Sequence, residues 1–341
     1  MNIQRNYLRL HQRWEEKALF KESEIILKTN HVVKEFNLSG NRVLTACNDI
    51  NLNVYKGKTL GIVGESGCGK STFVRMLMNL DEPTSGEILF HDNDIAHLSK
   101  QQKWLNRQSM QMVFQDPMAS FNPKMKIIDI LTEPLLNFKR IKKSEKEVKA
   151  KELLEMVELP ADFMYRYPHN MSGGQRQRVS IARALSLEPE VLVCDEATSA
   201  LDVSIQKTII ELLVRLQKEK DISMVFICHD LALIQSFAHQ IAVMYLGNVV
   251  EVLPGSEVYN SCLHPYTKAL LSAVFSINTD QNHKIESIEG EAPSPLDVPN
   301  GCPFQNRCEH CMEKCKIEKP VLKKINDGHE VACHYVNGNI I

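Results

Sequence analysis

The sequence lacks the long apolar runs of a membrane protein. No stretch reaches about 18 consecutive apolar residues, the length that crosses a bilayer as a helix, so we expect no transmembrane segment. The first 16 residues mix Arg9 and Arg13 with Glu15 and Glu16 and contain no apolar stretch, which excludes a secretory signal. We therefore expect a cytoplasmic protein, with any link to a membrane being peripheral.

The sequence also lacks a large excess of positive or negative charge. The formal net charge is -2 over 341 residues, which argues against broad binding of nucleic acid. No repeat of fixed period and no sustained heptad pattern is present. Hydrophobic residues make up 43% of the chain, enough to bury a core. The length suits one large α/β domain with an appendage, or two modest domains.

Cysteine is present in quantity, with ten residues unevenly spaced. Five are scattered through residues 47–262 and five crowd the C-terminus. In a reducing compartment such a cluster indicates metal binding before it indicates disulfides. The crowded cysteines are Cys302, Cys308, Cys311, Cys315 and Cys333.

Short apolar segments alternate with helix-like segments. Continuous apolar runs predict buried strands at 59–63, 191–194, 224–227 and 241–244. Shorter runs at 25–27 and 31–33 and a period-two pattern at 49–54 predict further strands, and helices are expected at 73–80, 125–160 and 205–219. This alternation predicts a parallel sheet covered on both faces. Residues 290–301 carry three prolines and are expected to form an extended linker.

A glycine-rich phosphate loop follows the strand expected at 59–63. The run fits the pattern G-x-x-x-x-G-K-[ST], and both the preceding strand and the following helix that the pattern requires are predicted. Glycines let successive N–H groups point at phosphates, the lysine bridges the outer phosphates and the serine hydroxyl binds Mg²⁺. The loop predicts ATP binding by Gly64, Glu65, Ser66, Gly67, Cys68, Gly69, Lys70, Ser71 and Thr72.

Two carboxylates end the strand expected at 191–194. Asp195 and Glu196 would be costly just past a buried strand unless they had a function. We interpret Asp195 as a residue that holds Mg²⁺ and Glu196 as the general base that polarises the attacking water. Cys68 and Cys194 are expected to serve packing through their side chains.

Four further motifs give the chain a family resemblance. Residues 171–178 (MSGGQRQR) resemble the signature motif of ABC-transporter ATPases, with Met171 in place of the usual leucine. Gln115 resembles that family's Q-loop, Asp202 in the segment SALD its D-loop, and His229 its switch histidine, the sensor of the γ-phosphate. Phe36 is a candidate for the aromatic ring that stacks on adenine.

The resemblance implies a fold and a site. The fold is a P-loop NTPase of the α/β class, with a RecA-like core, an antiparallel β subdomain and an α-helical subdomain at about 104–184, with Gln115 at its hinge. It implies catalytic roles for Glu196, His229 and Gln115, and Mg²⁺ contacts from Ser71, Gln115 and Asp195. Two such subunits would close head to tail, each lending the other Ser172, Gly173, Gly174, Gln175 and Asp202.

The tail narrows the resemblance to one group of importers. Residues 263–271 (LHPYTKALL) and 301–304 (GCPF) are similar to ATPases that serve oligopeptide, dipeptide and nickel importers. That group's implied cofactor is a [4Fe-4S] cluster on Cys302, Cys308, Cys315 and Cys333; zinc, unmetallated thiols and a ligand role for Cys311 stay open. The implied domains are an extension at 1–24, the ATPase at 25–262 and a cysteine-bearing region at 263–341.

Several functions are compatible with these motifs. The leading hypothesis is the ATPase subunit of a peptide importer on the cytoplasmic side of the membrane, partnered by a second ATPase, two permease subunits and an extracytoplasmic binding protein. A nickel or metal-chelator importer is the alternative, because the ATPase contacts no solute. A soluble ABC ATPase acting on ribosomes or DNA would carry two cassettes or a long coiled coil. A module with a dead site is disfavoured by the intact Lys70, Asp195, Glu196 and His229.

Overall fold

A computed structural model describes residues 20, 24–40, 42–275 and 293–339. The predicted N-terminal extension and the first part of the predicted linker lie largely outside these residues. The chain divides into two compact units, the first formed by Met1–His97 with Phe226–Ile341 and the second by Leu98–Val225. The division falls within strand β8, Ser223–Cys228. No helix among the described residues combines the length and apolarity needed to span a membrane.

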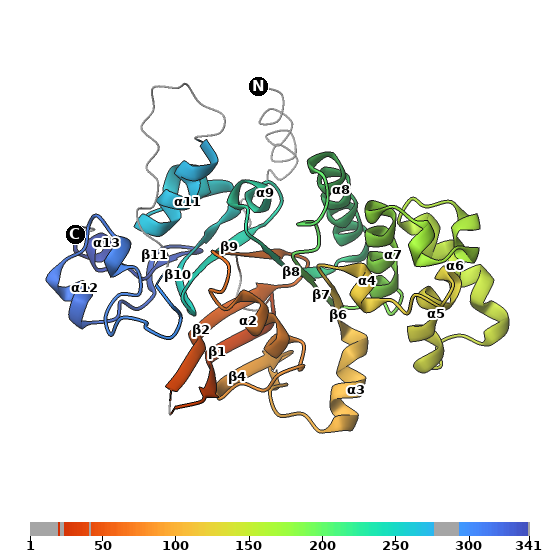
Figure 1. Cartoon of the computed structure of the whole chain (residues 1–341), viewed down its shortest axis with the longest axis horizontal. Coiled ribbons are helices and arrows are strands. Elements are labelled where there is room, and N and C mark those ends of the chain that lie inside the picture. The colour runs from red at the N-terminus through yellow and green to blue at the C-terminus, as the bar shows by residue number, and fades with distance from the viewer. Residues whose placement is uncertain (1–19, 21–23, 41, 276–292, 340–341) are drawn as a thin grey trace. The chain divides into compact units, whose positions relative to one another are not determined.

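The first unit contains an antiparallel sheet with the strand order β2-β1-β4-β5 (Figure 1). Its strands are β1 Ile25–Leu38, β2 Arg42–Tyr55, β4 Ser85–Phe90 and β5 Asn93–Asp94. The runs expected at 25–27 and 31–33 are therefore one strand. His31 has φ 50, and register shifts lie on both sides of Val32, so the break in the apolar pattern marks an irregularity within a strand.

A second sheet begins in the first unit with the order β11-β12-β10-β9-β3. Its strands are β3 Thr59–Val63, β9 Gln240–Tyr245, β10 Asn248–Pro254, β11 Lys323–Asn326 and β12 His329–Val331. β3 and β9 are parallel, as predicted. β10 runs antiparallel to β9 because Leu246 and Gly247, with φ 43 and 75, turn the chain back at once. The edge strand β10, which was not predicted, therefore adds an antiparallel strand beside the predicted parallel ones.

Helices of the first unit flank these sheets. They are α2 Lys70–Leu77, α9 Leu231–Gln235, α10 Val258–Ser261, α11 Pro265–Phe275, α12 Glu313–Ile317 and α13 His334–Asn339. α2 begins three residues earlier than predicted because Gly69 serves as its N-cap. Its inner face buries Phe73, Val74 and Leu77.

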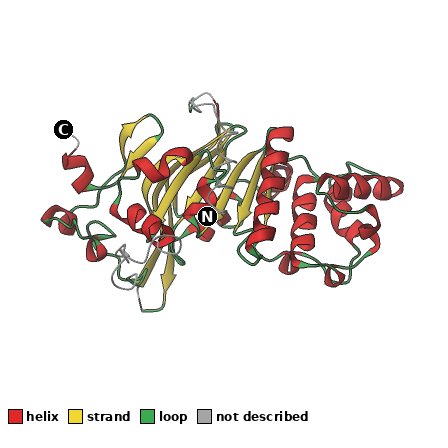
Figure 2. Cartoon of the chain, turned by 90° about the horizontal axis from the view of Figure 1, so that it is seen from above, coloured by secondary structure: helices red, strands yellow, loops and turns green. Residues whose placement is uncertain are grey.

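The second unit is mostly helical (Figure 2). Its helices are α3 Lys100–Ser109, α4 Pro117–Ser120, α5 Ile127–Asn137, α6 Lys146–Met156, α7 Gly173–Leu185 and α8 Val203–Lys220. Strands β6 Met110–Val113 and β7 Val191–Asp195 pair in parallel. α5, α6 and α7 pack on one another, which agrees with the predicted helical character of 125–160.

A buried carboxylate ties the C-terminal strand β12 to β10. Glu251 is fully buried and accepts hydrogen bonds from the Leu263 N–H at 2.7 Å and the His264 N–H at 3.2 Å. Nε2 of the buried His329 lies 2.9 Å from the same carboxylate. Burial lowers the pKa of His264 to about 4, and its neutral Nδ1 accepts from the Tyr266 N–H. Glu251 therefore joins β10, β12 and the start of α11.

We expect Glu251→Ala to lower the free energy of unfolding by about 3–5 kcal/mol, because it leaves the donors of the buried His264 and His329 and the half-buried Leu263 without their acceptor. Urea unfolding of the whole chain measures this. The control is Glu257→Ala, at an exposed carboxylate nearby, which should change stability by less than about 0.5 kcal/mol. Equal effects of the two substitutions would contradict the role given to the buried network.

Candidate nucleotide-binding site

The predicted phosphate loop joins β3 to α2 in the first unit. Gly69 has φ 105, and Lys70 is the first residue of α2. A Cβ on Gly69 would lie 2.1 Å from the carbonyl oxygen of Ala46, and one on Gly64 would lie 2.2 Å from that of Met244. Both positions therefore require glycine because a Cβ would not fit, and position 69 also requires it because of its left-handed backbone conformation. The loop leads directly into the N-terminus of α2, where phosphates bind well.

Lys70 and His229 meet at this loop. Lys70 is 4% exposed, and its Nζ donates to the carbonyl oxygens of Gly64 at 2.8 Å and Glu65 at 2.9 Å. Nδ1 of His229 lies 3.4 Å from Lys70 Nζ and 3.2 Å from the Gly64 oxygen. The first unit thus brings together the predicted phosphate lysine and the predicted γ-phosphate sensor, 159 residues apart.

The remaining loop side chains differ in burial. Ser71 is exposed at the start of α2, so its hydroxyl is accessible. Cys68 is buried, and burial raises the pKa of its thiol despite the nearby Lys70 ammonium. Burial also raises the pKa of Cys194, to about 12. Both cysteines are therefore neutral side chains in packed surroundings, in keeping with the predicted packing role.

The second unit carries the two carboxylates. Asp195 is the last residue of β7, and Glu196 follows with φ 47, a left-handed conformation that is uncommon outside glycine. Such strained residues cluster at functional sites. The Glu196 carbonyl accepts from both the N–H and the hydroxyl of Ser199 at 3.0 Å, and Gln115 Nε2 donates to that hydroxyl at 3.2 Å. The second unit therefore links Gln115 to Glu196 through Ser199.

The signature motif starts helix α7. Ser172 is the N-cap: its Oγ accepts from the Gln175 N–H at 3.3 Å, and the Gln175 side chain accepts from the Ser172 N–H at 2.9 Å. This capping box fixes the first turn. The N–H groups of a first turn have no acceptor within the helix, so those of Gly173 and Gly174 suit an anion.

The two glycines of the signature motif differ in whether packing requires a glycine at their position. A Cβ on Gly174 would lie 2.7 Å from Cγ2 of Ile205, so this glycine lets α7 approach α8 closely. A Cβ on Gly173 would be 3.4 Å from its nearest neighbour, Leu201, an ordinary contact. Packing therefore explains Gly174, whereas packing alone does not require glycine at position 173.

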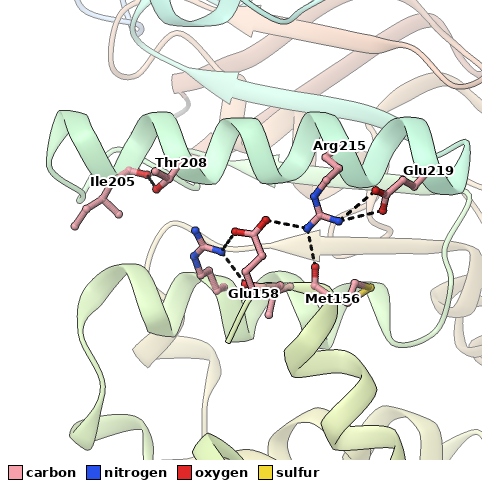
Figure 3. A network of polar contacts seen from close by, with 8 residues as sticks. Met156, Glu158, Ile205, Thr208, Arg215 and Glu219 are labelled. Atoms are coloured by element: carbon pink, nitrogen blue, oxygen red, sulfur yellow. Dashed lines mark hydrogen bonds and ion pairs between the residues drawn. The ribbon is translucent and has the colours of Figure 1, made fainter. Parts of the chain in front are cut away.

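A polar network ties α7 to its neighbours within the second unit (Figure 3). The Glu158 carboxylate binds Arg178 of α7 at 2.8 Å and Arg215 of α8 at 3.3 Å. Arg215 also donates to the Met156 carbonyl oxygen and to Glu219. The hydrogen bond from Arg178 lowers the pKa of Glu158, so the carboxylate stays charged at neutral pH. The network anchors the signature helix between α6 and α8.

Asp202 and Phe36 are the two remaining residues predicted for the nucleotide site. Asp202 is the N-cap of α8, but its side chain makes no capping hydrogen bond. Phe36 lies in β1, is 37% exposed, and has Lys34 Nζ 5.2 Å from the centre of its ring. Its role toward adenine stays a prediction.

The C-terminal cysteines gather in the first unit. The Cys302 N–H donates to the Cys315 carbonyl oxygen at 2.7 Å, and none of the ten cysteines, all of which the structure describes, forms a disulfide. The pKa of Cys302 is raised to about 12, chiefly by burial and to a smaller extent by the neighbouring thiols of Cys315, Cys308 and Cys333. Cys311 is more exposed and close to Cys315. Among the described residues, no three His, Cys, Asp or Glu side chains are arranged to hold a metal ion.

One contact at the phosphate loop was not predicted. Arg307 forms a two-point ion pair with Glu65, with N–O distances of 2.9 and 3.1 Å. The Tyr266 hydroxyl accepts from the Glu65 N–H at 3.0 Å. These residues are separated by more than 200 positions, and nothing in the sequence pairs them. The only signal was that Tyr266 falls in segment 263–271, on which the resemblance rests, and that Arg307 precedes Cys308, an implied cluster ligand.

Comparison with known proteins decides the family. The ABC transporter profile matches residues 47–199, and the profile of the oligopeptide/dipeptide transporter C-terminal region matches residues 250–315. An oligopeptide transport ATP-binding protein, OppF, from Haemophilus influenzae is 43% identical over 321 residues, covering 91% of this chain and 97% of the relative. The chain belongs to the ATP-binding subunits of oligopeptide and dipeptide ABC transporters.

Other relatives of this ABC subunit agree. The di/tripeptide transport ATP-binding protein DppF of Pseudomonas aeruginosa is 43% identical over 317 residues, covering 92% of this chain and 98% of its own. Among solved structures, the dimeric post-hydrolysis state of the ATP-binding cassette MJ0796, bound to ADP and Pi, aligns with a TM-score of 0.61 and 30% identity. It covers 67% of this chain and 98% of that chain. The predicted P-loop NTPase fold with a C-terminal oligopeptide-transporter region is confirmed.

Proposed function

We propose that this ABC subunit binds ATP on residues 64–72 and hydrolyses it to power peptide import. The observation that carries the proposal is the meeting of Lys70 and His229 at a glycine loop that leads into α2. A buried ammonium beside a histidine and a helix N-terminus has the charge and donors for a terminal phosphate. The names of the relatives support peptides as the solute.

The residues take the following roles. Lys70 holds the outer phosphates and His229 contacts the γ-phosphate. Ser71, Gln115 and Asp195 offer a hydroxyl, an amide and a carboxylate, the oxygen donors that Mg²⁺ prefers, and the metal would neutralise phosphate charge. Glu196 takes a proton from the attacking water. The inference that the phosphate loop, Asp195 and Glu196 act on the same nucleotide rests on the family resemblance.

The signature motif would act on a neighbouring subunit's nucleotide. α7 presents the first-turn N–H groups of Gly173 and Gly174, which suit a γ-phosphate held by the partner. The similarity to a dimeric cassette supports head-to-tail pairing, here with a second, homologous ATPase. ATP would close this pair because its γ-phosphate contacts both halves only in the closed state.

We expect Gly173→Asp to lower the ATPase rate of the assembled complex at least about 10-fold, because a carboxylate beside the partner's γ-phosphate adds like-charge repulsion. ATP affinity of the isolated chain should stay unchanged. Gly173→Ala is the matched control, since the site has room for a Cβ, and it should retain most of the activity. A lower ATP affinity in the isolated Gly173→Asp chain would argue against a role in trans.

The transporter itself would be built from further chains. We propose two permease subunits and an extracytoplasmic binding protein as partners, with this ABC subunit bound peripherally on the cytoplasmic side of the membrane. Import of nickel or a metal chelator is the second candidate, because the same kind of C-terminal tail occurs in those ATPases and the motifs do not report the solute. Identification of the ligand that co-purifies with the binding protein separates the two.

We further propose that the C-terminal cysteines hold a [4Fe-4S] cluster. Each iron of such a cluster takes one cysteine, and the thiols of Cys308, Cys315 and Cys333 are all near enough to Cys302 to affect its ionisation. Cys302, Cys308, Cys315 and Cys333 would be the ligands. The cluster would supply cross-links that hold this small region folded.

Anaerobically purified protein should contain about four irons per chain and absorb visible light, as expected for a cluster held by four cysteines. Cys315→Ser should lose most of the iron, whereas Cys311→Ser, at the more exposed neighbour, should retain it. A colourless, iron-free and fully folded protein would contradict the cluster.

A further inference from the structure

The ion pair between Glu65 and Arg307 joins the phosphate loop to the cysteine region. Both guanidinium Nη atoms bind the carboxylate, at 2.9 and 3.1 Å. The Arg307 side chain is 8% exposed and that of Glu65 is 28% exposed. Two-point Arg–carboxylate pairs that are shielded from water are the strong and geometrically specific ones. This contact therefore differs from the exposed ion pairs elsewhere in the C-terminal region, such as Lys316–Glu313.

Aromatic side chains fix the geometry of the pair. Arg307 Nη1 also donates to the Tyr245 hydroxyl at 3.3 Å. Phe304, which is 2% exposed, packs on the rings of Tyr245 and Tyr266 with centres 5.3 and 5.4 Å apart. Tyr266 is fully buried, and its hydroxyl accepts from the Glu65 N–H. One packed aromatic cluster therefore contacts both Arg307, through Tyr245, and Glu65, through Tyr266.

The N–H, the carboxylate and the carbonyl oxygen of Glu65 are all hydrogen-bonded, and the partner of the carbonyl oxygen is the phosphate-loop lysine, Lys70. The Glu65 N–H is held by Tyr266, its carboxylate by Arg307, and its carbonyl oxygen accepts from Lys70 Nζ at 2.9 Å. A shift of Glu65 would therefore change the position of the loop backbone and of Lys70 together. Small displacements of groups that position a ligand can have large effects on binding.

The turn that carries Arg307 is built from the cysteine region. It is a 3₁₀ turn, Gln305–Arg307, and cysteines flank it at 302 and 308. The Gln305 N–H donates to the Cys302 carbonyl oxygen at 3.1 Å, and the Cys302 N–H donates to that of Cys315 at 2.7 Å. The position of Arg307 thus depends on how the cysteine region folds.

We propose that Arg307 is a positioning residue through which the cysteine region sets the nucleotide affinity of the phosphate loop. When the cysteine region is folded, it holds Glu65 and the phosphate loop in the geometry that binds ATP. When that region is perturbed, Glu65 and the loop are released and ATP binds more weakly. Linkage makes the effect reciprocal, so bound nucleotide must stabilise the cysteine region to the same extent. The inference rests on the proposed nucleotide role of residues 64–72.

Mg-ATP affinity of the full chain in its assembled complex tests the coupling. Arg307→Gln and Glu65→Gln should each raise the Kd about 5- to 10-fold, at the lower end of typical coupling between sites. The double variant should be no weaker than either single one, because both remove the same contact. In Arg307→Gln the kcat at saturating ATP should stay within about twofold of wild type, since Arg307 positions the loop and does not touch the reacting atoms. Lys316→Gln, which breaks an exposed ion pair in the same region, is the matched control and should leave the Kd unchanged.

Hydrogen exchange provides a second measurement, whose result would not change if Arg307 had only a structural role. Mg-ATP should slow amide exchange in residues 302–316 of the wild-type complex and fail to do so in Arg307→Gln. A wild-type Kd in both single variants would overturn the proposal. If Arg307→Gln does not fold, Glu65→Gln removes the same pair without altering the C-terminal region and decides the question. Wild-type binding by Lys70→Ala would instead show that the loop assignment itself is wrong.

Discussion

Glu196→Gln should lower the ATPase rate of the assembled transporter at least about 100-fold while leaving ATP binding intact. A general base contributes roughly 10²–10⁴ in rate, and glutamine has the same shape but cannot take a proton. The residue follows β7 in a left-handed conformation, and its carbonyl is held by Ser199. Because ATP would bind without being cleaved, the variant should also trap the closed dimer. Single-turnover hydrolysis and size-exclusion chromatography with Mg-ATP measure the two effects.

The chain offers a matched control for that substitution. Glu188 lies just before β7, is exposed, and also has a positive φ of 55. Glu188→Gln therefore makes the same chemical change in a similar backbone conformation, and it should leave the hydrolysis rate unchanged. Normal hydrolysis by Glu196→Gln would show that the base has been assigned wrongly.

Lys70→Ala should weaken ATP binding by about 100-fold. The side chain is almost fully buried and reaches the carbonyl oxygens of Gly64 and Glu65, so its ammonium is available only to groups at the loop. Charge-assisted hydrogen bonds are each worth about 1.5–3 kcal/mol, and about 2.7 kcal/mol corresponds to a 100-fold change in Kd. Equilibrium binding of a fluorescent ATP analogue by the full chain measures the loss.

An exposed lysine separates this effect from a general loss of positive charge. Lys151 pairs with Glu155 on the surface of α6 and is 59% exposed. Lys151→Ala should bind ATP as the wild type does, and thermal unfolding should show that both variants are folded. Equal loss of affinity in the two variants would contradict the assignment of the loop.

The local elements of the nucleotide site were predictable from the sequence. β3 and β7 are continuous apolar runs, and the loop residues follow a motif with one spatial solution. His229 was predicted by resemblance, and the structure places it 3.4 Å from Lys70 Nζ. The positions of these elements were predictable because each depends on neighbours in the chain or on a motif of fixed spacing.

Pairings between distant segments were not predictable. β12 joins β10 through a buried Glu251–His329 contact, but a carboxylate within a strand pattern gives no sign of its partner. Likewise, Glu65 was predicted only as an ATP-binding residue of the phosphate loop, and the motif gives no sign of its partner Arg307, 242 positions later. Gly174 was assigned a role toward phosphate, whereas the structure adds a packing reason, its close approach to Ile205.

The central claim is that hydrolysis by this subunit drives peptide import. ATP-dependent uptake by proteoliposomes that contain the complete transporter tests it most directly, with a labelled pool of di- to pentapeptides and with Ni²⁺ offered separately. The account predicts peptide accumulation with the wild-type subunit, and less than about a tenth of that rate with Glu196→Gln, given the contribution of a general base. Accumulation of nickel without peptide, or undiminished peptide uptake with Glu196→Gln, would contradict it.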